Sequence, residues 1–358
     1  MTRRPRTGSR RNSDMQTNAD IMNITIGVVG AGSWGTALAN LLACKGFAVD
    51  HWVYEPEVVA QMREERENRR FLPGVILSDN LRPSGDLEAV VAGKDLILVV
   101  TPSHVTRQTM ARCGGVVGPD TIVVSASKGI ENQTHLTMSG VLAQVIPGLS
   151  AERLAVLTGP SFAKEVARQV PTGVTVASSD AATAARVQQV FATAYFRVYT
   201  IDDVIGAELG AAVKNVIAIA AGVIDGLGLG LNTRATLITR GLVEIRRLGL
   251  AMGAQPRTFT GLAGVGDLIL TCTGDLSRNH TIGKQIGEGK KLNDLLAEMH
   301  MVAEGVKTAR SVYDLSRELG VEMPISHAVY HVLYDDLDPK TALYQLMTRD
   351  LKQELDEI

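Results

Sequence analysis

The chain has 358 residues, and its hydrophobic fraction of 45% and charged fraction of 21% are typical of a soluble globular protein. This length is enough for two domains, each with a buried core. The 36 lysines and arginines nearly balance the 38 aspartates and glutamates. The overall charge therefore does not favour nucleic acid or an anionic membrane as a partner.

The cysteines, histidines and apolar runs indicate which metal sites, membrane spans and cellular compartments are compatible with the sequence. The longest apolar stretch, residues 216–224, ends at Asp225 and is too short to span a bilayer. The seven histidines are scattered, without metal-ligand spacing or a His–Asp pair suggestive of a dehydrogenase relay, and we expect each to be structural. The cysteines are far apart and odd in number, which favours a reducing, cytoplasmic compartment: Cys44, Cys113 and Cys272. We expect no metal site, no membrane span and no nucleic-acid partner.

Residues 1–22 differ from the rest of the chain. They contain five arginines among serines, threonines and asparagines, with no apolar period: Arg3, Arg4, Arg6, Arg10 and Arg11. A signal peptide needs an apolar core after its basic start, and none is present. We predict a disordered basic tail, with a true start near Met15 or Met22 as one explanation. An organelle transit peptide and a nucleic-acid-binding arm are the alternatives.

The folded part begins with an apolar run at residues 24–29, followed by a glycine-rich turn and a helical pattern from Thr36. Gly30, Gly32 and Gly35 stand in the order G-x-G-x-x-G. The first glycine allows a tight turn, the second a close approach to a pyrophosphate, and the third close packing of helix on strand. The free amides at the helix start suit the phosphates. The segment predicts a dinucleotide site, with an ordinary glycine-rich turn as the alternative.

A second strand is predicted at residues 48–54, and Glu55 follows it 20 residues past Gly35. A carboxylate at this place can accept hydrogen bonds from a ribose 2′-hydroxyl and would repel a 2′-phosphate, which favours NAD over NADP. NADP stays open for two reasons. Glu55 could merely begin the next helix, and four arginines nearby could offset its charge: Arg63, Arg66, Arg69 and Arg70.

Three more buried strands are predicted at residues 95–100, 121–126 and 154–158, each followed by small polar, glycine or proline residues. Ligands of an open parallel sheet bind off the carboxyl ends of its strands. Lys128 and Ser161 are therefore candidates for one site, although Lys128 could also be an ordinary loop lysine. The sheet is predicted to end with strands at 174–177 and 196–200 around a helix at 181–193.

Beyond residue 202 the pattern is almost entirely helical. We predict a Rossmann-type doubly wound parallel sheet over residues 23–202 and an all-α substrate-binding domain over residues 203–358.

Lys214 is the most informative residue of the second half. Its helix face consists of small and apolar residues and has no acid at i±3 or i±4. We therefore expect an unpaired ammonium whose pKa is lowered by desolvation and by a second cation such as Lys128. A lowered pKa suits a general acid–base lysine. The alternative is a lysine that snorkels to water.

Further candidates follow in the same half. Asp267 and Thr271 lie four residues apart on one helix face, although Asp267 could instead be a helix N-cap. Arg278 precedes a helical segment at 281–286, where a guanidinium and free amides can hold one phosphate. A solvated surface arginine is the alternative.

Seven segments in this order resemble NAD(P)-dependent glycerol-3-phosphate dehydrogenase over essentially the whole chain after the tail: residues 30–39, 71–74, 127–131, 159–165, 208–215, 261–267 and 277–279. The resemblance implies reversible reduction of dihydroxyacetone phosphate to sn-glycerol 3-phosphate, which supplies the backbone of glycerophospholipids. It also implies a homodimer.

The resemblance assigns roles residue by residue. Lys214 would exchange the proton with the reacting oxygen, with Lys128 and Asp267 as further catalytic residues. Substrate binding would involve these three and Gly159, Ser161, Asn215, Thr271, Ser277, Arg278 and Asn279. Cofactor binding would involve Gly30, Gly32, Ser33, Trp34, Gly35, Tyr54, Glu55, Phe71, Lys128, Ala163, Arg278, Val302 and Glu304.

The acid at Glu55 departs from the bacterial pattern, in which a basic residue near this place often accompanies NADPH. It is similar to the NAD-specific animal enzymes instead. Two rival functions remain. One is another Rossmann-plus-helical dehydrogenase that acts on a 3-hydroxy acid or a sugar acid. The other is a non-catalytic redox sensor that binds the dinucleotide and has no need of Lys214.

Overall fold

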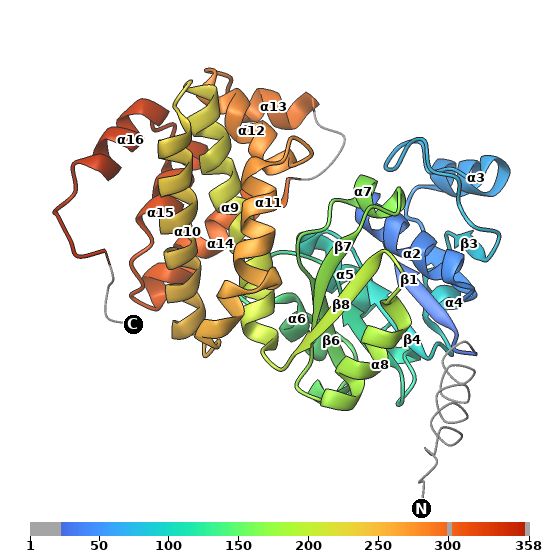
Figure 1. The fold of residues 1–358 in the computed structure, drawn as a ribbon. Coiled ribbons are helices and arrows are strands. Elements are labelled where there is room, and N and C mark those ends of the chain that lie inside the picture. The colour runs from blue at the N-terminus through green and yellow to red at the C-terminus, as the bar shows by residue number, and fades with distance from the viewer. Residues whose placement is uncertain (1–22, 299–302, 355–358) are drawn as a thin grey trace, which may run out of the picture.

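The computed structural model describes residues 23–298 and 303–354 (Figure 1). The predicted basic tail at 1–22 and the candidate Val302 lie outside these residues. A sheet domain is followed by a helical domain, and the two lie side by side. The predicted fold class, a Rossmann-type sheet followed by an all-α domain, is confirmed.

One eight-stranded sheet runs through the first domain in the order β3-β2-β1-β4-β5-β6-β7-β8. Its strands are β1 (Ile26–Val29), β2 (Val49–Trp52), β3 (Leu81–Ser84), β4 (Leu96–Val99), β5 (Ile122–Ser125), β6 (Leu154–Thr158), β7 (Thr172–Ala177) and β8 (Phe196–Ile201). The strand order reverses between β1 and β4. In sheets of this kind the ligand crevice opens at that point, off the carboxyl ends of the strands.

Two features of the sheet differ from the prediction. The sequence does not predict β3, because Arg82 and Pro83 interrupt its apolar pattern; an edge strand tolerates such a proline. The second difference is that β7 runs antiparallel to β6. The connecting helix α7 (Ala163–Ala167) has five residues and rises only about 7.5 Å. A parallel crossover takes about a dozen residues or more, usually with a longer helix, and the connection at 159–171 is at that lower limit.

Helices cover both faces of the sheet, because its central strands are apolar on both sides. In β4, Leu96 and Leu98 belong to one core cluster, and Ile97 and Val99 belong to another on the opposite face. The helices of this domain are α2 (Ser33–Lys45), α3 (Pro56–Glu65), α4 (Leu87–Val91), α5 (Ser103–Ala111), α6 (Met138–Val145), α7 and α8 (Ala181–Phe191), with short 3₁₀ turns at Gly114–Val116 and Ala151–Arg153.

The helical domain is built around α9 (Val204–Gly226). The other elements are α10 (Leu231–Ala251), η3 (Pro256–Thr260), η4 (Leu262–Gly266), α11 (Asp267–Thr273), α12 (Arg278–Gly287), α13 (Leu292–Glu298), α14 (Glu304–Glu318), α15 (Pro324–Tyr334) and α16 (Pro339–Met347). By length and composition α9 could cross a membrane, with a mean hydropathy of 1.6. However, 83% of that apolar window is buried within the protein, so packing inside the domain accounts for its apolar character.

Close helix packing fixes α12 against α9. A Cβ at Gly222 of α9 would lie 2.0 Å from the His280 carbonyl oxygen, and one at Gly283 of α12 would lie 2.0 Å from the Ile219 carbonyl oxygen. Only glycine allows the two backbones to approach this closely. The contact brings the start of α12 to the level of the middle of α9, where the candidate site lies.

Candidate active site

The predicted dinucleotide turn joins β1 to α2. Gly30 has a φ of +114°, and a Cβ at Gly35 would lie 1.9 Å from the Gly30 carbonyl oxygen, so both positions require glycine. A Cβ at Gly32 would meet no atom within 4 Å, which leaves this side of the turn open. The first turn of α2 contains no acidic residue. Its N-terminus is therefore suited to a phosphate.

Three aromatic or polar candidates line the same turn. The Ser33 hydroxyl donates to the Phe71 carbonyl oxygen at 2.5 Å, and the Trp34 and Phe71 rings pack partly buried against the sheet core. The buried indole N–H of Trp34 has no hydrogen-bond partner in the part of the chain that the structure describes. Buried N–H groups without a partner are rare. The indole N–H and the open face of the turn fit a bound dinucleotide.

His51, in β2, contacts the backbone of the glycine-rich turn. The sequence did not predict this contact. The His51 Nε2 lies 3.0 Å from the Gly30 carbonyl oxygen. A carbonyl oxygen only accepts, so Nε2 carries the proton and donates. Burial lowers the pKa of His51 to about 4, so the ring is neutral at physiological pH. No sequence pattern relates a strand histidine to the preceding turn, because the contact depends on how β1 and β2 pair.

Glu55 stands at the end of β2, beside the exposed Tyr54 ring. It is the N-cap residue of α3, but its side chain makes no capping hydrogen bond. The four arginines that could have offset its charge contact other groups: Arg63 the Pro83 carbonyl, Arg66 Asp79, Arg69 Glu65 and Glu67, and Arg70 Glu57. The contacts of these arginines are thus with groups other than the Glu55 side chain.

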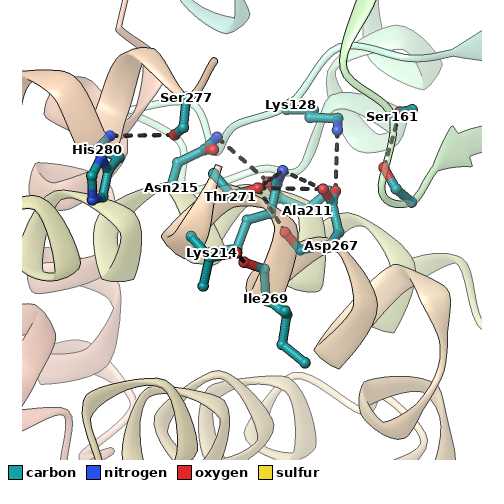
Figure 2. Close-up of polar contacts among 12 residues, drawn as sticks. Lys128, Ser161, Ala211, Lys214, Asn215, Asp267, Ile269, Thr271, Ser277 and His280 are labelled. Carbon is teal, nitrogen blue, oxygen red and sulfur yellow. Dashed lines mark hydrogen bonds and ion pairs between the residues drawn. The ribbon is translucent and has the colours of Figure 1, made fainter. Parts of the chain in front are cut away.

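Lys214 lies in the middle of α9, and its side chain is only 6% exposed. Its Nζ donates to Asp267 Oδ1 at 2.6 Å and to Thr271 Oγ1 at 2.7 Å (Figure 2). The second carboxylate oxygen, Asp267 Oδ2, accepts from Lys128 Nζ at 3.1 Å. One buried carboxylate therefore joins two ammonium groups, one from each domain.

The expectation of an unpaired ammonium at Lys214 is wrong. No acid lies one turn away on α9, but Asp267 reaches it from α11, 53 residues further along the chain. The snorkelling alternative also fails, because the amine is buried. The expected direction of the pKa shift is confirmed: burial lowers the pKa of Lys214 to about 8, the Asp267 carboxylate opposes that shift, and the Lys128 ammonium adds to it.

Asp267 is placed by two neighbouring elements. It begins α11 directly after the π-helical turn η4, and it is not the N-cap that local sequence suggests, since Gly266 holds that position. Thr271 lies one turn further on, and its hydroxyl also donates to the Asp267 carbonyl oxygen at 2.6 Å. A Cβ at Gly210 of α9 would lie 2.2 Å from the backbone oxygen of η4 residue Ala263. This close contact sets η4, and with it Asp267, against α9.

The sheet contributes residues that follow its central strands. Lys128 follows β5, and its ion pair with Asp267 distinguishes it from an ordinary loop lysine. Ser161 follows β6 and donates from Oγ to the Gly159 carbonyl oxygen at 3.0 Å. In Figure 2 the Lys128 amine lies above the Asp267 carboxylate, with Ser161 to the right of both. Ala163 begins α7 just beyond this turn.

The candidate phosphate clamp lies at the start of α12. Ser277 is the N-cap residue, and its side chain accepts from the His280 N–H. Arg278 is the first helical residue and reaches solvent. Desolvation by its surroundings lowers the pKa of the Arg278 guanidinium, and the Glu304 carboxylate opposes this shift. Asn279 Oδ1 accepts from the Gly305 N–H at 2.9 Å, which leaves its Nδ2 as the group able to donate to a ligand.

A His–Asp pair supports this clamp structurally. His280 Nε2 lies 2.7 Å from Asp225 Oδ2, and Arg234 donates to the other carboxylate oxygen of Asp225. The pair joins the first turn of α12 to the end of α9, 55 residues earlier. Such a distance in sequence leaves no local signal. In residues 23–298 and 303–354, no group of three or more His, Cys, Asp or Glu residues is placed to hold a metal ion.

Glu304 and Asn215 complete the candidate set. The Glu304 carboxylate accepts from the Ser103 N–H at 3.1 Å and from the Ser103 hydroxyl at 2.6 Å, so it links α14 to the start of α5. Asn215 follows Lys214 on α9, and its Nδ2 donates to the Ala211 carbonyl oxygen at 3.5 Å. Ser103 was not predicted, because its partner lies 201 residues away.

Comparison with known proteins settles the family. Residues 25–184 match the model described as the N-terminus of NAD-dependent glycerol-3-phosphate dehydrogenase, and residues 203–344 match the corresponding C-terminus model. The chain belongs to the NAD-dependent glycerol-3-phosphate dehydrogenase family. The resemblance inferred from the sequence segments is therefore confirmed.

Similar proteins in this family cover nearly the whole chain. The glycerol-3-phosphate dehydrogenase [NAD(P)+] of Syntrophobacter fumaroxidans is 57% identical over 92% of this chain and 97% of its own length. That of Geobacter sulfurreducens is also 57% identical, over 93% of this chain and 99% of its own length. The crystal structure of glycerol-3-phosphate dehydrogenase from Coxiella burnetii superimposes with a TM-score of 0.87 at 39% identity, over 92% of this chain and 100% of that chain.

Proposed function

We propose that the chain catalyses the reversible NAD(P)H-dependent reduction of dihydroxyacetone phosphate to sn-glycerol 3-phosphate, the backbone of glycerophospholipids. The observation that carries the proposal is the Lys128–Asp267–Lys214 cluster in a chain of this family. Relatives named for this reaction share 57% of their residues with it over more than nine-tenths of its length.

Lys214 is the proton donor to the carbonyl oxygen in reduction and the acceptor in oxidation. Its pKa of about 8 supports this role, because a sizeable fraction of both protonation states exists near neutral pH. Asp267 and Thr271 hold the ammonium in place with bonds of 2.6 and 2.7 Å. A group held so firmly needs little reorganisation when the proton moves.

Lys128 and Asn215 stabilise and position the reacting oxygen. Negative charge develops on that oxygen during reduction, and a fixed ammonium such as Lys128 stabilises it most strongly where water is excluded. Lys128 is held by Asp267 and is only 19% exposed, which supports this role. Asn215 has its amide on the same α9 turn as Lys214.

The substrate phosphate is bound by Arg278, Asn279 and the start of α12, with Ser277 as cap and with Gly159 and Ser161 lining the opposite wall. A planar guanidinium, a side-chain amide and a helix N-terminus together suit a dianion. Binding energy from the phosphate helps to hold the carbonyl in line with Lys214, although the phosphate itself does not react.

The dinucleotide lies over the Gly30–Gly35 turn. When bound, the reduced nicotinamide supplies the hydride that reaches the ketone carbon. Cofactor contacts come from both domains, namely from Gly32, Ser33, Trp34, Tyr54, Phe71, Lys128, Ala163, Arg278, Val302 and Glu304. The negative charge of Glu55 makes NAD the preferred form and NADP the weaker one.

Three wider properties belong to the same proposal. The protein acts in the cytoplasm, which is supported by its three free cysteines. It forms a homodimer, which rests on the family resemblance alone. The limits of its domains are 23–202 and 203–358, which is supported by the end of β8 at Ile201 and the start of α9 at Val204.

The deciding experiment compares NADH and NADPH oxidation by the purified chain with dihydroxyacetone phosphate and with unphosphorylated dihydroxyacetone. The proposal expects rapid turnover only with the phosphate ester, and a higher kcat/KM with NADH. Equal rates with both ketones would remove the phosphate clamp from the account. Faster turnover of a 3-hydroxy acid would favour the rival dehydrogenase, and cofactor binding without any turnover would favour the redox sensor.

A further inference from the structure

Three helices share an unusual kind of N-terminal cap. In α5, α6 and α15 the residue at the N-cap position makes no side-chain capping bond. A glutamate from another helix takes its place and accepts both the backbone N–H and the hydroxyl of a serine in the first turn. The pairs are Glu304 with Ser103, Glu208 with Ser139, and Glu244 with Ser326. Free N–H groups at a helix start are strong partners for a carboxylate.

Two of these caps cross between the domains, and the third does not. Glu304 and Glu208 belong to the helical domain, whereas Ser103 and Ser139 belong to the sheet domain. Glu244 lies on α10 and caps α15 inside the helical domain. The Glu244 cap therefore offers an internal comparison for the other two.

The Glu208 cap is connected along the chain to both lysines of the candidate site. Glu208 is 5% exposed, lies six residues before Lys214 on α9, and accepts from the Ser139 N–H at 2.7 Å and the Ser139 hydroxyl at 2.5 Å. Ser139 is the second residue of α6, the helix that follows the Lys128 loop, residues 126–137. One helix, α9, therefore carries Lys214 and also holds the far end of the loop that presents Lys128.

The same loop is docked on the helical domain at further points. Ile130 is 2% exposed and belongs to the core cluster of the helical domain, although it comes from the sheet domain. Its carbonyl oxygen accepts from the Ser311 hydroxyl of α14 at 2.9 Å. At the loop's start, Lys128 contacts Asp267. The loop is thus held at its beginning, its middle and its end by α11, α14 and α9.

We infer that Glu208 is a positioning residue for the reaction: by capping α6 from α9, it holds the Lys128 loop where one carboxylate can bridge Lys128 and Lys214. The inference rests on the proposed function, since it assigns Glu208 a part in the same chemistry. Glu208 does not touch the reacting atoms. It acts through the position of Lys128.

Replacement of Glu208 by glutamine tests this with little change in volume. The amide offers one acceptor oxygen where the carboxylate offered two, and it carries no charge, so the two charge-assisted bonds to Ser139 become a neutral bond from the Ser139 N–H and a weaker contact between the NH₂ group and the Ser139 hydroxyl oxygen. The end of the loop is then held more weakly, although Glu131 keeps its ion pair with Arg107 and His135 its contact with Glu318, and we expect Lys128 to shift relative to Asp267. The groups that act on the charge of Lys214 are Asp267, Lys128 and Cys272, and the Lys128 ammonium is one that lowers the Lys214 pKa. Loss of Lys128 from its place therefore raises that pKa.

The experiment compares Glu208→Gln with Glu244→Gln, which makes the same change in a cap remote from the site. For both variants we measure thermal stability, the dissociation constant of NADH, and the pH profile of kcat/KM for dihydroxyacetone phosphate. In Glu208→Gln we expect kcat/KM to fall about tenfold and its alkaline limb to move to higher pH, while the dissociation constant of NADH changes much less than kcat/KM because Lys128 is one of many proposed cofactor contacts. In Glu244→Gln we expect lower thermal stability, with the alkaline limb of the kcat/KM profile at the same pH as in the wild-type protein.

Equal loss of stability in the two variants, with kcat/KM and the alkaline limb unchanged in Glu208→Gln, would overturn the inference and leave Glu208 a structural cap. If Glu208→Gln does not fold, Ser139→Ala removes one of the two donors and is measured in the same way; an unmoved limb there would have the same meaning. Failure of the proposed function is distinguishable, because the wild-type protein would then show no turnover of dihydroxyacetone phosphate.

Discussion

Asp267→Asn is the substitution whose effect on the site follows most directly from the geometry. The asparagine has nearly the same shape, but it removes the one negative charge that faces both Lys214 and Lys128. The two ammonium groups then face each other without the bridging carboxylate. Since Asp267 raises the pKa of Lys214 and Lys128 lowers it, the substitution lowers that pKa below its present value of about 8.

The size of the effect can be worked out. An opposite charge at hydrogen-bond distance shifts a pKa by about 1 to 3 units, so a fall of about 1.5 units brings the pKa of Lys214 to roughly 6.5. At about pH 7.5 the protonated fraction then drops from about three quarters to about one tenth. Reduction at that pH would slow by about eightfold from this cause alone. The buried cations would also cost stability, on the order of 3 kcal/mol.

The assay is the pH profile of kcat/KM for dihydroxyacetone phosphate reduction by the wild-type and Asp267→Asn proteins. In the proposed mechanism reduction needs protonated Lys214, so the alkaline limb should report its pKa in the free enzyme. We expect this limb to move toward neutral pH in the variant. A limb that stays in place, or moves to higher pH, would refute the assignment of the limb to a Lys214 held between these charges.

Three further substitutions test other parts of the site. Arg278→Ala, measured at saturating NADH, should raise KM for dihydroxyacetone phosphate by about 10- to 100-fold and change the slow turnover of unphosphorylated dihydroxyacetone much less; an equal loss with both ketones would contradict a phosphate contact. Glu55→Arg should move the ratio of kcat/KM values toward NADPH, and an unchanged ratio would show that another residue sets the preference. Gly35→Ala places a Cβ 1.9 Å from the Gly30 carbonyl oxygen, so calorimetry should show a stability loss of at least about 2 kcal/mol and weakened NADH binding; unchanged binding would contradict the close packing of the turn.

Much of the sheet could be predicted because buried parallel strands are continuous apolar runs. The strand β6 matches its prediction at both ends, and the centres of β1, β4 and β5 lie within theirs. The prediction failed where local sequence and tertiary position disagree. Pro83 interrupts the apolar pattern of the edge strand β3, so the pattern does not predict it. The orientation of β7 depends on the short connection before it and not on any pattern within the strand.

The candidate site divides in the same way. Residues that follow strands or begin helices, such as Lys128 and Arg278, could be identified because the fold places strand ends and helix starts at the crevice. Contacts between elements could not. Helical periodicity compares residues one turn apart, so it cannot reveal that the partner of Lys214 lies on α11. The caps formed by Glu208 and Glu304 join residues 69 and 201 positions apart.

The central claim is that the buried ammonium of Lys214 delivers the proton to the ketone oxygen. Lys214→Met tests it most directly, because methionine fills similar space without a proton to give. With saturating NADH and dihydroxyacetone phosphate, we expect kcat to fall by at least about 100-fold while NADH still binds, and the alkaline limb near pH 8 to disappear from the pH profile. A variant that keeps wild-type kcat, or keeps that limb, would contradict the account.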